Sequence, residues 1–265
     1  MKSEEIHSLL ATRYSLLVKM RISVDEKKVK RNTLLGRYAL VGSLVILMGG
    51  LVLTLFGQNF GLLDAKNTTL FFAIYAVILV LGFGISRIGM HFGNRHLSPL
   101  RPELALRENL KGLDRKYALM LFQQPTDYFL VEPGGVTVFI MRGQPGKTAY
   151  KAGKWKRRES FLTFWMGREE PLGNPTADAT EALKKIGDMM AAKFPDLKVP
   201  VRAVIVFTNA KAELDVETSP IPVLMAEDLK DYLRSDNKLR ELPNSVMRKV
   251  REALGAPELP KGEQQ

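Results

Sequence analysis

Two long apolar stretches without a charged residue constrain this chain more than any other feature of its sequence. They span residues 38–56 and 69–86. An α-helix needs about 20 predominantly apolar residues to cross the hydrocarbon core of a bilayer, and both stretches reach that length. A buried helix of a soluble domain rarely stays uncharged for so long. The sequence therefore predicts a membrane hairpin of two transmembrane helices, at about residues 37–57 and 68–88.

Basic residues flank the two stretches unevenly. The connection at residues 57–68 carries only Asp64 and Lys66, whereas many cations stand outside it, at Lys27, Lys28, Lys30, Arg31, Arg37, Arg87, Arg95 and Arg101. Because cytoplasmic flanks are enriched in Lys and Arg, we expect a multi-pass protein of the cell membrane with two spans and both termini in the cytoplasm. The net charge of +11 also favours an anionic partner, either nucleic acid or an anionic lipid surface.

Composition disfavours several classes of function. No Asp, Glu, Lys or Arg lies in the middle of either span, which argues against a channel or carrier. The chain has no cysteine, which excludes disulfides, Cys-ligated zinc and thiol nucleophiles, and its three histidines are scattered. Glycines within the spans would let the two helices approach closely, or let the chain associate with a second copy or another membrane protein; they are Gly42, Gly49, Gly50, Gly82 and Gly84.

The remaining residues divide into three predicted segments. Residues 1–34 are polar and basic, with an apolar stripe at helical spacing that predicts an amphipathic helix, either on the bilayer surface or packed on the soluble domain or a partner. Residues 100–255 form a cytoplasmic α/β domain of ordinary single-domain size, and residues 256–265 a disordered tail. Residues 35–90 hold the membrane hairpin.

Predicted helices and strands alternate within residues 100–255. Expected helices cover residues 103–113, 176–194, 226–233 and 239–254, and expected strands cover residues 117–122, 128–132, 136–141, 161–166, 201–208 and 222–223. Pro133, Gly134 and Gly135 separate two apolar runs and predict a β-hairpin. With Glu132 opposite Val136, the open end of that hairpin brings Asp127 near Met141. An ion pair between Asp127 and Arg142 would follow.

This order of elements, together with its local residues, resembles the NERD (nuclease-related) domain, a relative of the restriction-endonuclease-like PD-(D/E)xK nucleases. The matching residues are Glu103, Asp127, the turn Gly134-Gly135-Val136, Trp155, Asn174-Pro175 and residues 204–207. The resemblance implies a restriction-endonuclease-like α/β fold with a central mixed sheet. In that family the strand after the Gly turn ends in Glu-x-Lys, and an Asn-Pro-x-x-Gln sequence starts the following helix.

Three positions depart from the family pattern. Ile140 stands where the resemblance places a metal-binding Glu, Arg142 where it places Lys, and Asp178 where it places Gln. Isoleucine offers no oxygen ligand for Mg²⁺, and arginine is permanently protonated, so it is unable to act as a base. We therefore expect no catalytic residue, no metal and no cofactor. The alternative is a nuclease that uses Mg²⁺ or Mn²⁺ at a migrated site of Asp127, Glu103 and Asp178.

A run of basic residues at positions 147–158 is the candidate binding segment. It comprises Lys147, Lys151, Lys154, Trp155, Lys156, Arg157 and Arg158. The cations would contact nucleic-acid phosphates while Trp155 and Tyr150 stack on bases, or the run would be a loop that faces lipid headgroups or solvent. We expect a membrane-anchored, NERD-like, non-catalytic domain that binds nucleic acid or a lipid or protein partner; the enzyme alternative is a membrane-tethered, metal-dependent nuclease with a rearranged active site.

Overall fold

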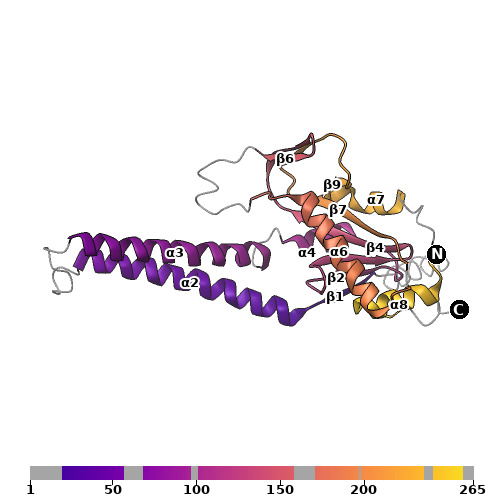
Figure 1. Cartoon of the computed structure of the whole chain (residues 1–265), viewed down its shortest axis with the longest axis horizontal. Helices are drawn as coiled ribbons and strands as arrows, with labels where there is room; N and C mark the ends of the chain where they lie inside the picture. The colour runs from indigo at the N-terminus through magenta and orange to yellow at the C-terminus, as the bar shows by residue number, and fades with distance from the viewer. Residues whose placement is uncertain are drawn as a thin grey trace, which may run out of the picture. The chain divides into compact units, whose positions relative to one another are not determined.

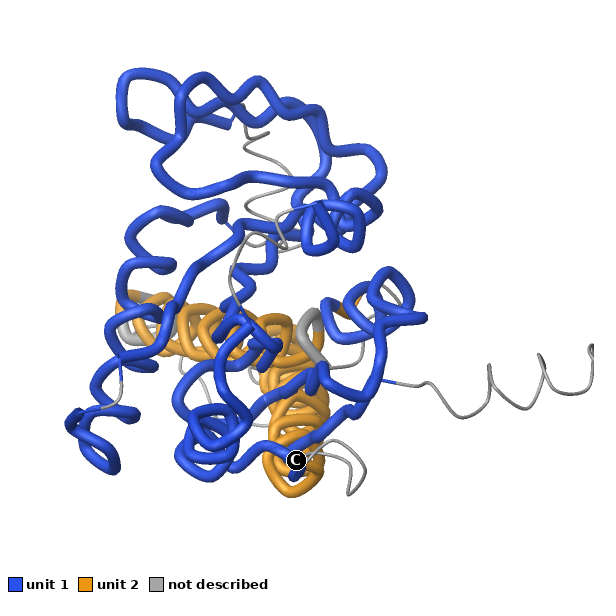
Figure 2. The backbone as a smooth tube through the Cα atoms, turned by 90° about the vertical axis from the view of Figure 1, so that its right-hand side faces the viewer, with its two compact units in different colours: residues 1–25, 102–159, 171–265 blue, residues 26–101, 160–170 orange. Residues whose placement is uncertain are grey.

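The computed structural model describes residues 20–56, 68–96, 101–157, 171–196, 198–235 and 241–258 (Figure 1). The chain forms two compact units (Figure 2). The first, here called the α/β unit, joins Met1–Asp25 to Pro102–Glu159 and Pro171–Gln265. The second, here called the helical unit, is centred on Glu26–Arg101. The predicted helix within residues 1–19 and the predicted strand at residues 161–166 lie outside the described residues.

A six-stranded mixed sheet forms the centre of the α/β unit, which confirms the predicted α/β class. Its strand order is β1-β2-β3-β4-β7-β9. The pairs β2–β3 and β3–β4 are antiparallel, and the pairs β1–β2, β4–β7 and β7–β9 are parallel. The strands are β1 (Arg21–Val24), β2 (Ala118–Leu121), β3 (Tyr128–Glu132), β4 (Gly135–Arg142), β7 (Val201–Phe207) and β9 (Val223–Met225).

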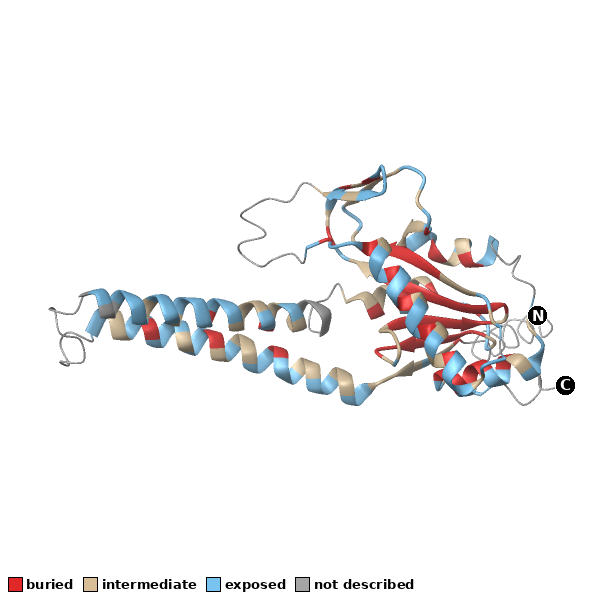
Figure 3. Ribbon diagram, in the orientation of Figure 1, coloured by how far each residue is buried: buried red, intermediate tan, exposed pale blue. Residues whose placement is uncertain are grey.

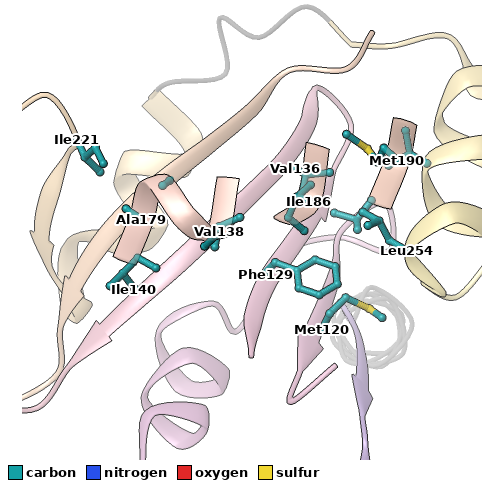
Figure 4. Close-up of a cluster of buried hydrophobic side chains, with 14 of the residues drawn as sticks. Met120, Phe129, Val136, Val138, Ile140, Ala179, Ile186, Met190, Ile221 and Leu254 are labelled. Carbon is teal, nitrogen blue, oxygen red and sulfur yellow. The ribbon is translucent and has the colours of Figure 1, made fainter. Parts of the chain in front are cut away.

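Helices on the α/β unit bury the apolar side chains of this sheet. The helices are α4 (Pro102–Asn109), α6 (Pro175–Lys193), α7 (Leu229–Ser235), which follows the short 3₁₀ helix η2 (Ala226–Asp228), and α8 (Asn244–Leu254). Ala179, Ala182, Ile186 and Met190 recur at helical spacing along α6 and join one core cluster with alternate residues of β4 (Figure 4). Figure 3 shows that the buried residues concentrate in these central strands.

Strand β1 has no counterpart among the predicted strands. It consists of four residues, RISV, and pairs in parallel with β2 from Arg21 opposite Ala118 to Val24 opposite Leu121. Backbone hydrogen bonds extend the pairing at both ends, from Met20 N–H to the Leu113 carbonyl (3.0 Å) and from Asp25 N–H to the Leu121 carbonyl (3.2 Å). The α/β unit therefore contains residues from before the two long helices, up to Asp25, in addition to residues from Pro102 onward.

The C-terminal end of the α/β unit is held by a buried arginine. Arg251 is 2% exposed and donates to the carbonyl oxygens of Pro257 (2.6 Å) and Lys116. The Ala256 N–H donates to the Arg251 carbonyl (2.8 Å), and Arg21 donates to the Glu258 carbonyl. Residues 256–258, predicted to be disordered, thus lie against the rest of the unit, and residues 259–265 lie outside the described part of the chain.

The helical unit consists of two long helices, α2 (Glu26–Phe56) and α3 (Thr68–His96). Both are long and apolar enough to cross a membrane, and only 11% of the apolar window of each is buried. The core helix of a soluble domain would be mostly buried, whereas the apolar side chains of α2 and α3 are mostly exposed, as they are in helices that contact lipid. Helix α2 begins at Glu26, earlier than predicted, and includes the basic residues up to Arg37 in its first turns.

Small residues form the contact between α2 and α3. Gly36, Ser43 and Gly50 recur every seven residues along α2 and are its buried positions. A Cβ placed on Gly50 would lie 2.6 Å from Cγ2 of Ile78, and one placed on Gly89 would lie 2.9 Å from the backbone nitrogen of Leu40. Close backbone approach of this kind is how helices in an apolar solvent gain packing contacts.

We expect Gly50→Leu to destabilise the pairing of α2 with α3, because the new side chain would overlap Ile78. Overpacking of this kind costs about 1–3 kcal/mol. Gly49→Leu is the matched control, because a Cβ at Gly49 has no neighbour within 4 Å. Thermal unfolding of the full chain in detergent, followed by circular dichroism, measures both. Equal melting temperatures for the two variants would contradict the packing described here.

Candidate functional site

The predicted hairpin is formed by β3 and β4, with a register that differs from the prediction by one residue. Glu132 lies opposite Gly135, and Val131 opposite Val136. The turn therefore contains only Pro133 and Gly134. Gly135 has a φ of +150°, and a Cβ at this position would collide with the Pro200 carbonyl, which accepts a hydrogen bond from Val136 N–H (3.0 Å). This close approach of the backbones requires glycine.

Arg142, at the end of β4, is held by acceptors on three segments. Its guanidinium forms an ion pair with Asp178 in the first turn of α6. Its Nε donates to the Leu172 carbonyl (3.1 Å), and its Nη1 to the Met141 carbonyl (2.9 Å). The Arg142 side chain is 15% exposed and that of Asp178 is 51% exposed. The ion pair shown at Arg142 is thus with Asp178, and its pairing with Asp127 stays a prediction.

Local sequence explains why Asp178 lies at this place. Asn174 is the N-cap of α6, and its side-chain oxygen accepts from Ala177 N–H (3.2 Å). Pro175 occupies the first turn, where its missing N–H costs no helical hydrogen bond. An acidic residue in that turn is favoured by the positive end of the helix dipole. Asp178 therefore stabilises the start of α6 and neutralises Arg142 at the same time.

Ile140 belongs to the apolar core rather than to a polar site. It is 9% exposed and joins the cluster that α6 forms with β4 and β7. Figure 4 places it beside Ala179 of α6, one residue after Asp178 in sequence. Three positions that depart from the nuclease-related pattern therefore come together in space: Ile140 fills the core, and Arg142 pairs with Asp178 at its border.

The two other acidic positions are Glu103 and Asp127. Glu103 is in the first turn of α4 and is 7% exposed. Asp127 directly precedes β3, and its backbone carbonyl accepts a hydrogen bond from Phe122 N–H (2.5 Å). Within the part of the chain that the structure describes, no three Asp, Glu or His side chains lie close enough to hold a metal ion. A third carboxylate, Asp178, is already paired with Arg142.

A buried polar network at the turn end of the hairpin has no counterpart among the predicted site residues. Arg202 of β7 donates to both carboxylate oxygens of Glu132 (3.1 and 3.2 Å) and to the hydroxyl of Thr137 (2.8 Å). Its guanidinium also lies over the ring of Tyr232, 5.5 Å from the centroid. Burial and then the charge of Glu132 raise the pKa of Tyr117 above its ordinary value. The sequence signal for this network is a single charged residue in each of two otherwise apolar strands, Glu132 in β3 and Arg202 in β7.

The basic run is a β-hairpin rather than a loop. Strands β5 (Gly146–Lys151) and β6 (Lys154–Arg157) pair in antiparallel fashion, and β5 pairs in parallel with β8 (Ala212–Val216). The three strands form a second sheet, with the order β6-β5-β8. Ala152 and Gly153 connect β5 to β6 with φ values of +50° and +75°, which is the backbone of a type I′ turn.

Acidic residues of β8 and its end neutralise part of the basic hairpin. Lys147 and Lys151 lie 3.5 and 3.2 Å from the Asp215 carboxylate, and Lys151 lies 3.7 Å from that of Glu217. The hydrogen bond between Lys151 and Asp215 raises the pKa of the lysine and lowers the pKa of the aspartate. Lys154 and Lys156 are exposed and have no such partner among the described residues. They are the cations that remain available to a ligand.

The aromatic residues of the hairpin face the interior. Trp155 donates from Nε1 to the Thr176 hydroxyl (2.8 Å), and its ring centroid lies 5.0 Å from that of Tyr150 and 6.3 Å from that of Phe207. Tyr150 is 6% exposed. Neither ring is free to stack on a base in this conformation, so the structure does not support the expectation that Trp155 and Tyr150 stack on nucleic-acid bases. Arg157 donates to the Pro145 carbonyl (3.0 and 3.2 Å), and Arg158 lies outside the described residues.

No family model, no curated protein and no solved structure matches this chain. The likeness to nuclease-related domains therefore stays a prediction from its residues.

We expect Lys154→Glu with Lys156→Glu to weaken binding of double-stranded DNA and to reduce its salt dependence. Each lost phosphate contact lowers the magnitude of the slope of log K against log salt by about 0.9, so the pair lowers it by about two. Asp215→Asn should strengthen binding, because it frees Lys147 and leaves Lys151 with Glu217 as its only acidic partner among the described residues. The measurement is fluorescence anisotropy with the full chain in detergent at several salt concentrations.

Glu213→Gln is the matched control for Asp215→Asn. Glu213 is exposed on the same strand, and its loss changes the net charge equally without freeing a paired lysine. Equal gains for Glu213→Gln and Asp215→Asn would show that overall charge, rather than the lysines of the hairpin, governs binding.

Proposed function

We propose that this chain is a membrane-anchored protein whose α/β unit acts by binding rather than by catalysis, on a nuclease-related scaffold. The carrying observation is the ion pair between Arg142 and Asp178 beside the buried Ile140. The anchor is the pair of helices α2 and α3, whose apolar windows are only 11% buried by the rest of the chain and match the length of a bilayer core.

The strand pairing of β1 with β2 supports one arrangement of that anchor. Residues 20–25 precede α2, and residues from 102 onward follow α3, yet both belong to the α/β unit. Two segments that fold together lie on one side of a membrane, so α2 and α3 cross it once each, in opposite directions. The many Lys and Arg residues on this side favour the cytoplasm.

We expect single cysteines to report this topology, since the natural chain contains none. In intact cells, a membrane-impermeant maleimide should label Asp64→Cys, in the connection between α2 and α3, and should not label Lys198→Cys in the α/β unit. Both should react after permeabilisation, which controls for accessibility. Labelling of Lys198→Cys in intact cells would place the α/β unit outside and refute the proposed orientation.

The non-catalytic interpretation rests on three positions that depart from the pattern of the resembled family, two of which neutralise each other. In the pattern of the resembled family, a Glu, a Lys and a Gln would hold a metal and orient water. Here an isoleucine occupies the first position and packs in the core, while an arginine and an aspartate at the other two neutralise each other. A Glu at position 140, in the surroundings that this chain provides, would place a carboxylate in an apolar core, which costs several kcal/mol unless the carboxylate is paired.

The exposed side chains of the hairpin can contact the phosphate groups of a ligand but cannot stack on its bases. Lys154 and Lys156 offer exposed charge on one face of the β5–β6 hairpin, whereas Trp155 and Tyr150 are held in the interior. Stacking aromatic residues supply much of the affinity of proteins for single-stranded nucleic acid. Their orientation here favours contacts to phosphates at a surface, such as lipid headgroups or a duplex backbone, over capture of unpaired bases.

We expect the full chain in detergent to leave single- and double-stranded DNA uncut with Mg²⁺ or Mn²⁺. The triple variant Ile140→Glu, Arg142→Lys, Asp178→Gln should gain weak metal-dependent cleavage, because it restores an oxygen ligand and a titratable lysine. Gel electrophoresis of a labelled duplex and single strand detects both outcomes.

Asp127→Ala controls for a contaminating nuclease. Cleavage by the natural chain that disappears in Asp127→Ala would establish a rearranged metal site and overturn the binding proposal. Circular dichroism checks that the triple variant retains its fold, because the carboxylate introduced at position 140 enters the core. The result with the natural chain decides the proposal even if that variant unfolds.

A further inference from the structure

The outward face of α2 changes from apolar to cationic within one helical turn. From Tyr38 onward this face carries exposed apolar side chains, such as Val41, Val45 and Met48. Before Tyr38 it carries four exposed cations, Lys27, Lys30, Arg31 and Arg37. Both parts belong to one continuous helix. The cations therefore continue the surface that lipid chains would contact.

Helical geometry places the four cations on one side of α2. Gly36 marks the direction of α3, because a Cβ there would lie 3.1 Å from Cβ of Phe92. At about 100° per residue, Arg37 and Lys30 lie about 100–120° from that direction, and Lys27 and Arg31 about 180–220° from it. The cations thus face away from α3 and share about a third of the circumference of the helix.

Within the described residues these four cations form no ion pair, and the one acidic residue of α2 is Glu26 at its first position, against four cations on this face. Lys27 and Arg31 stand four residues apart, and like charges at that spacing destabilise a helix by a few tenths of a kcal/mol. An external anion would remove this repulsion. Lys147 and Lys151 of the α/β unit, by contrast, have the carboxylate of Asp215.

The cationic face begins in the polar layer of a membrane and extends beyond it into the water. The distance from Lys27 to Arg37 along the axis is about 15 Å at 1.5 Å per residue. The headgroup layer on each side of a bilayer is about 5–7 Å thick, and a lysine or arginine stem reaches several ångströms further along the surface. Arg37 then lies at headgroup depth. Arg31 and Lys30 start about 9–11 Å further along the axis and reach the headgroups with their long side chains. Lys27 lies beyond the headgroups but within a Debye length of about 8–10 Å of them.

We infer that this face of α2 is a selective binding surface for anionic phospholipids. The headgroup phosphate is held by Arg31, Arg37 and Lys30, while the acyl chains lie along Val41, Val45 and Met48. The inference rests on the proposed membrane anchor. A nucleic acid or an acidic protein would match the charges, but neither supplies an apolar chain for the surface directly beyond Tyr38. A single anionic amphiphile matches both parts.

The test measures which lipids surround the full chain in reconstituted vesicles. Spin-labelled phosphatidylglycerol and phosphatidylcholine report, by electron paramagnetic resonance, the relative association of each with the protein. Vesicles contain an excess of phosphatidylcholine over phosphatidylglycerol. Each cation near the surface contributes about fivefold in association. We expect phosphatidylglycerol to associate at least about tenfold more strongly than phosphatidylcholine, and Lys27→Gln, Lys30→Gln, Arg31→Gln, Arg37→Gln together to reduce that ratio at least about fivefold, the remaining flanking cations retaining part of it.

Two further variants locate the effect. Lys184→Gln, Lys211→Gln, Arg234→Gln and Arg248→Gln together remove the same charge from exposed sites of the α/β unit and should leave the ratio unchanged. Leu34→Lys adds a cation to the middle of the cationic face of α2 and should raise the ratio of phosphatidylglycerol to phosphatidylcholine association. An equal loss of selectivity in both fourfold variants would overturn the inference, because net charge alone would then account for it.

Extraction with alkaline carbonate separates this inference from the proposed anchor. A natural chain that resists extraction yet shows equal association of the two lipids would refute lipid selectivity and leave the anchor intact. A chain released from the vesicles by carbonate would refute both. Retained near-UV circular dichroism of the fourfold α2 variant shows that any loss of selectivity is not caused by unfolding.

Discussion

The parallel pairing of β1 with β2 is the interaction on which the arrangement of the whole chain depends. It joins residues before α2 to residues after α3 in one sheet, so the helical unit is an insertion in the α/β unit. A single residue, Asp25, separates β1 from α2. Completion of the sheet therefore requires both ends of the helical pair on the same side of any membrane that it crosses. A fragment that started at residue 100 would lack this edge strand and leave part of β2 unpaired.

A second consequence of the sheet concerns the open end of the β3–β4 hairpin. Because β4 and β7 are parallel and α6 packs on them, Arg142 at the end of β4 meets the first turn of α6. Such a meeting point of strand ends and a helix start is a common place for ligands and catalytic groups in α/β folds. In this chain the place is filled by apolar packing from Ile140 and by an internal ion pair. Side chains that would otherwise face a ligand instead stabilise the scaffold.

Much of this fold is predictable from residues alone, and the differences have physical causes. The two long helices, β3, β4, α6 and β7 follow from hydrophobic runs and periodicity that no local alternative matches. The register of the hairpin differs by one residue because Pro133-Gly134-Gly135 permits turns of two or three residues, and the contact of Gly135 with Pro200 selects the shorter one. Strand β1 escapes prediction because four residues carry too little periodicity, and its partner lies nearly a hundred residues away.

The candidate site is less predictable because the exposure and charge of its residues depend on pairings with residues distant in sequence. Four lysines and two arginines within residues 147–158 are typical of a solvated loop; only the pairing of this run with β8 shows that alternate residues face inward. Asp215 and Glu217, distant in sequence, then neutralise two of the lysines. The excess positive charge of the chain is therefore not spread evenly over its surface. Among the described residues, the outer face of α2 carries four exposed cations within eleven residues and the edge strand β6 carries two more, and these are the two faces at which we propose that an anion binds.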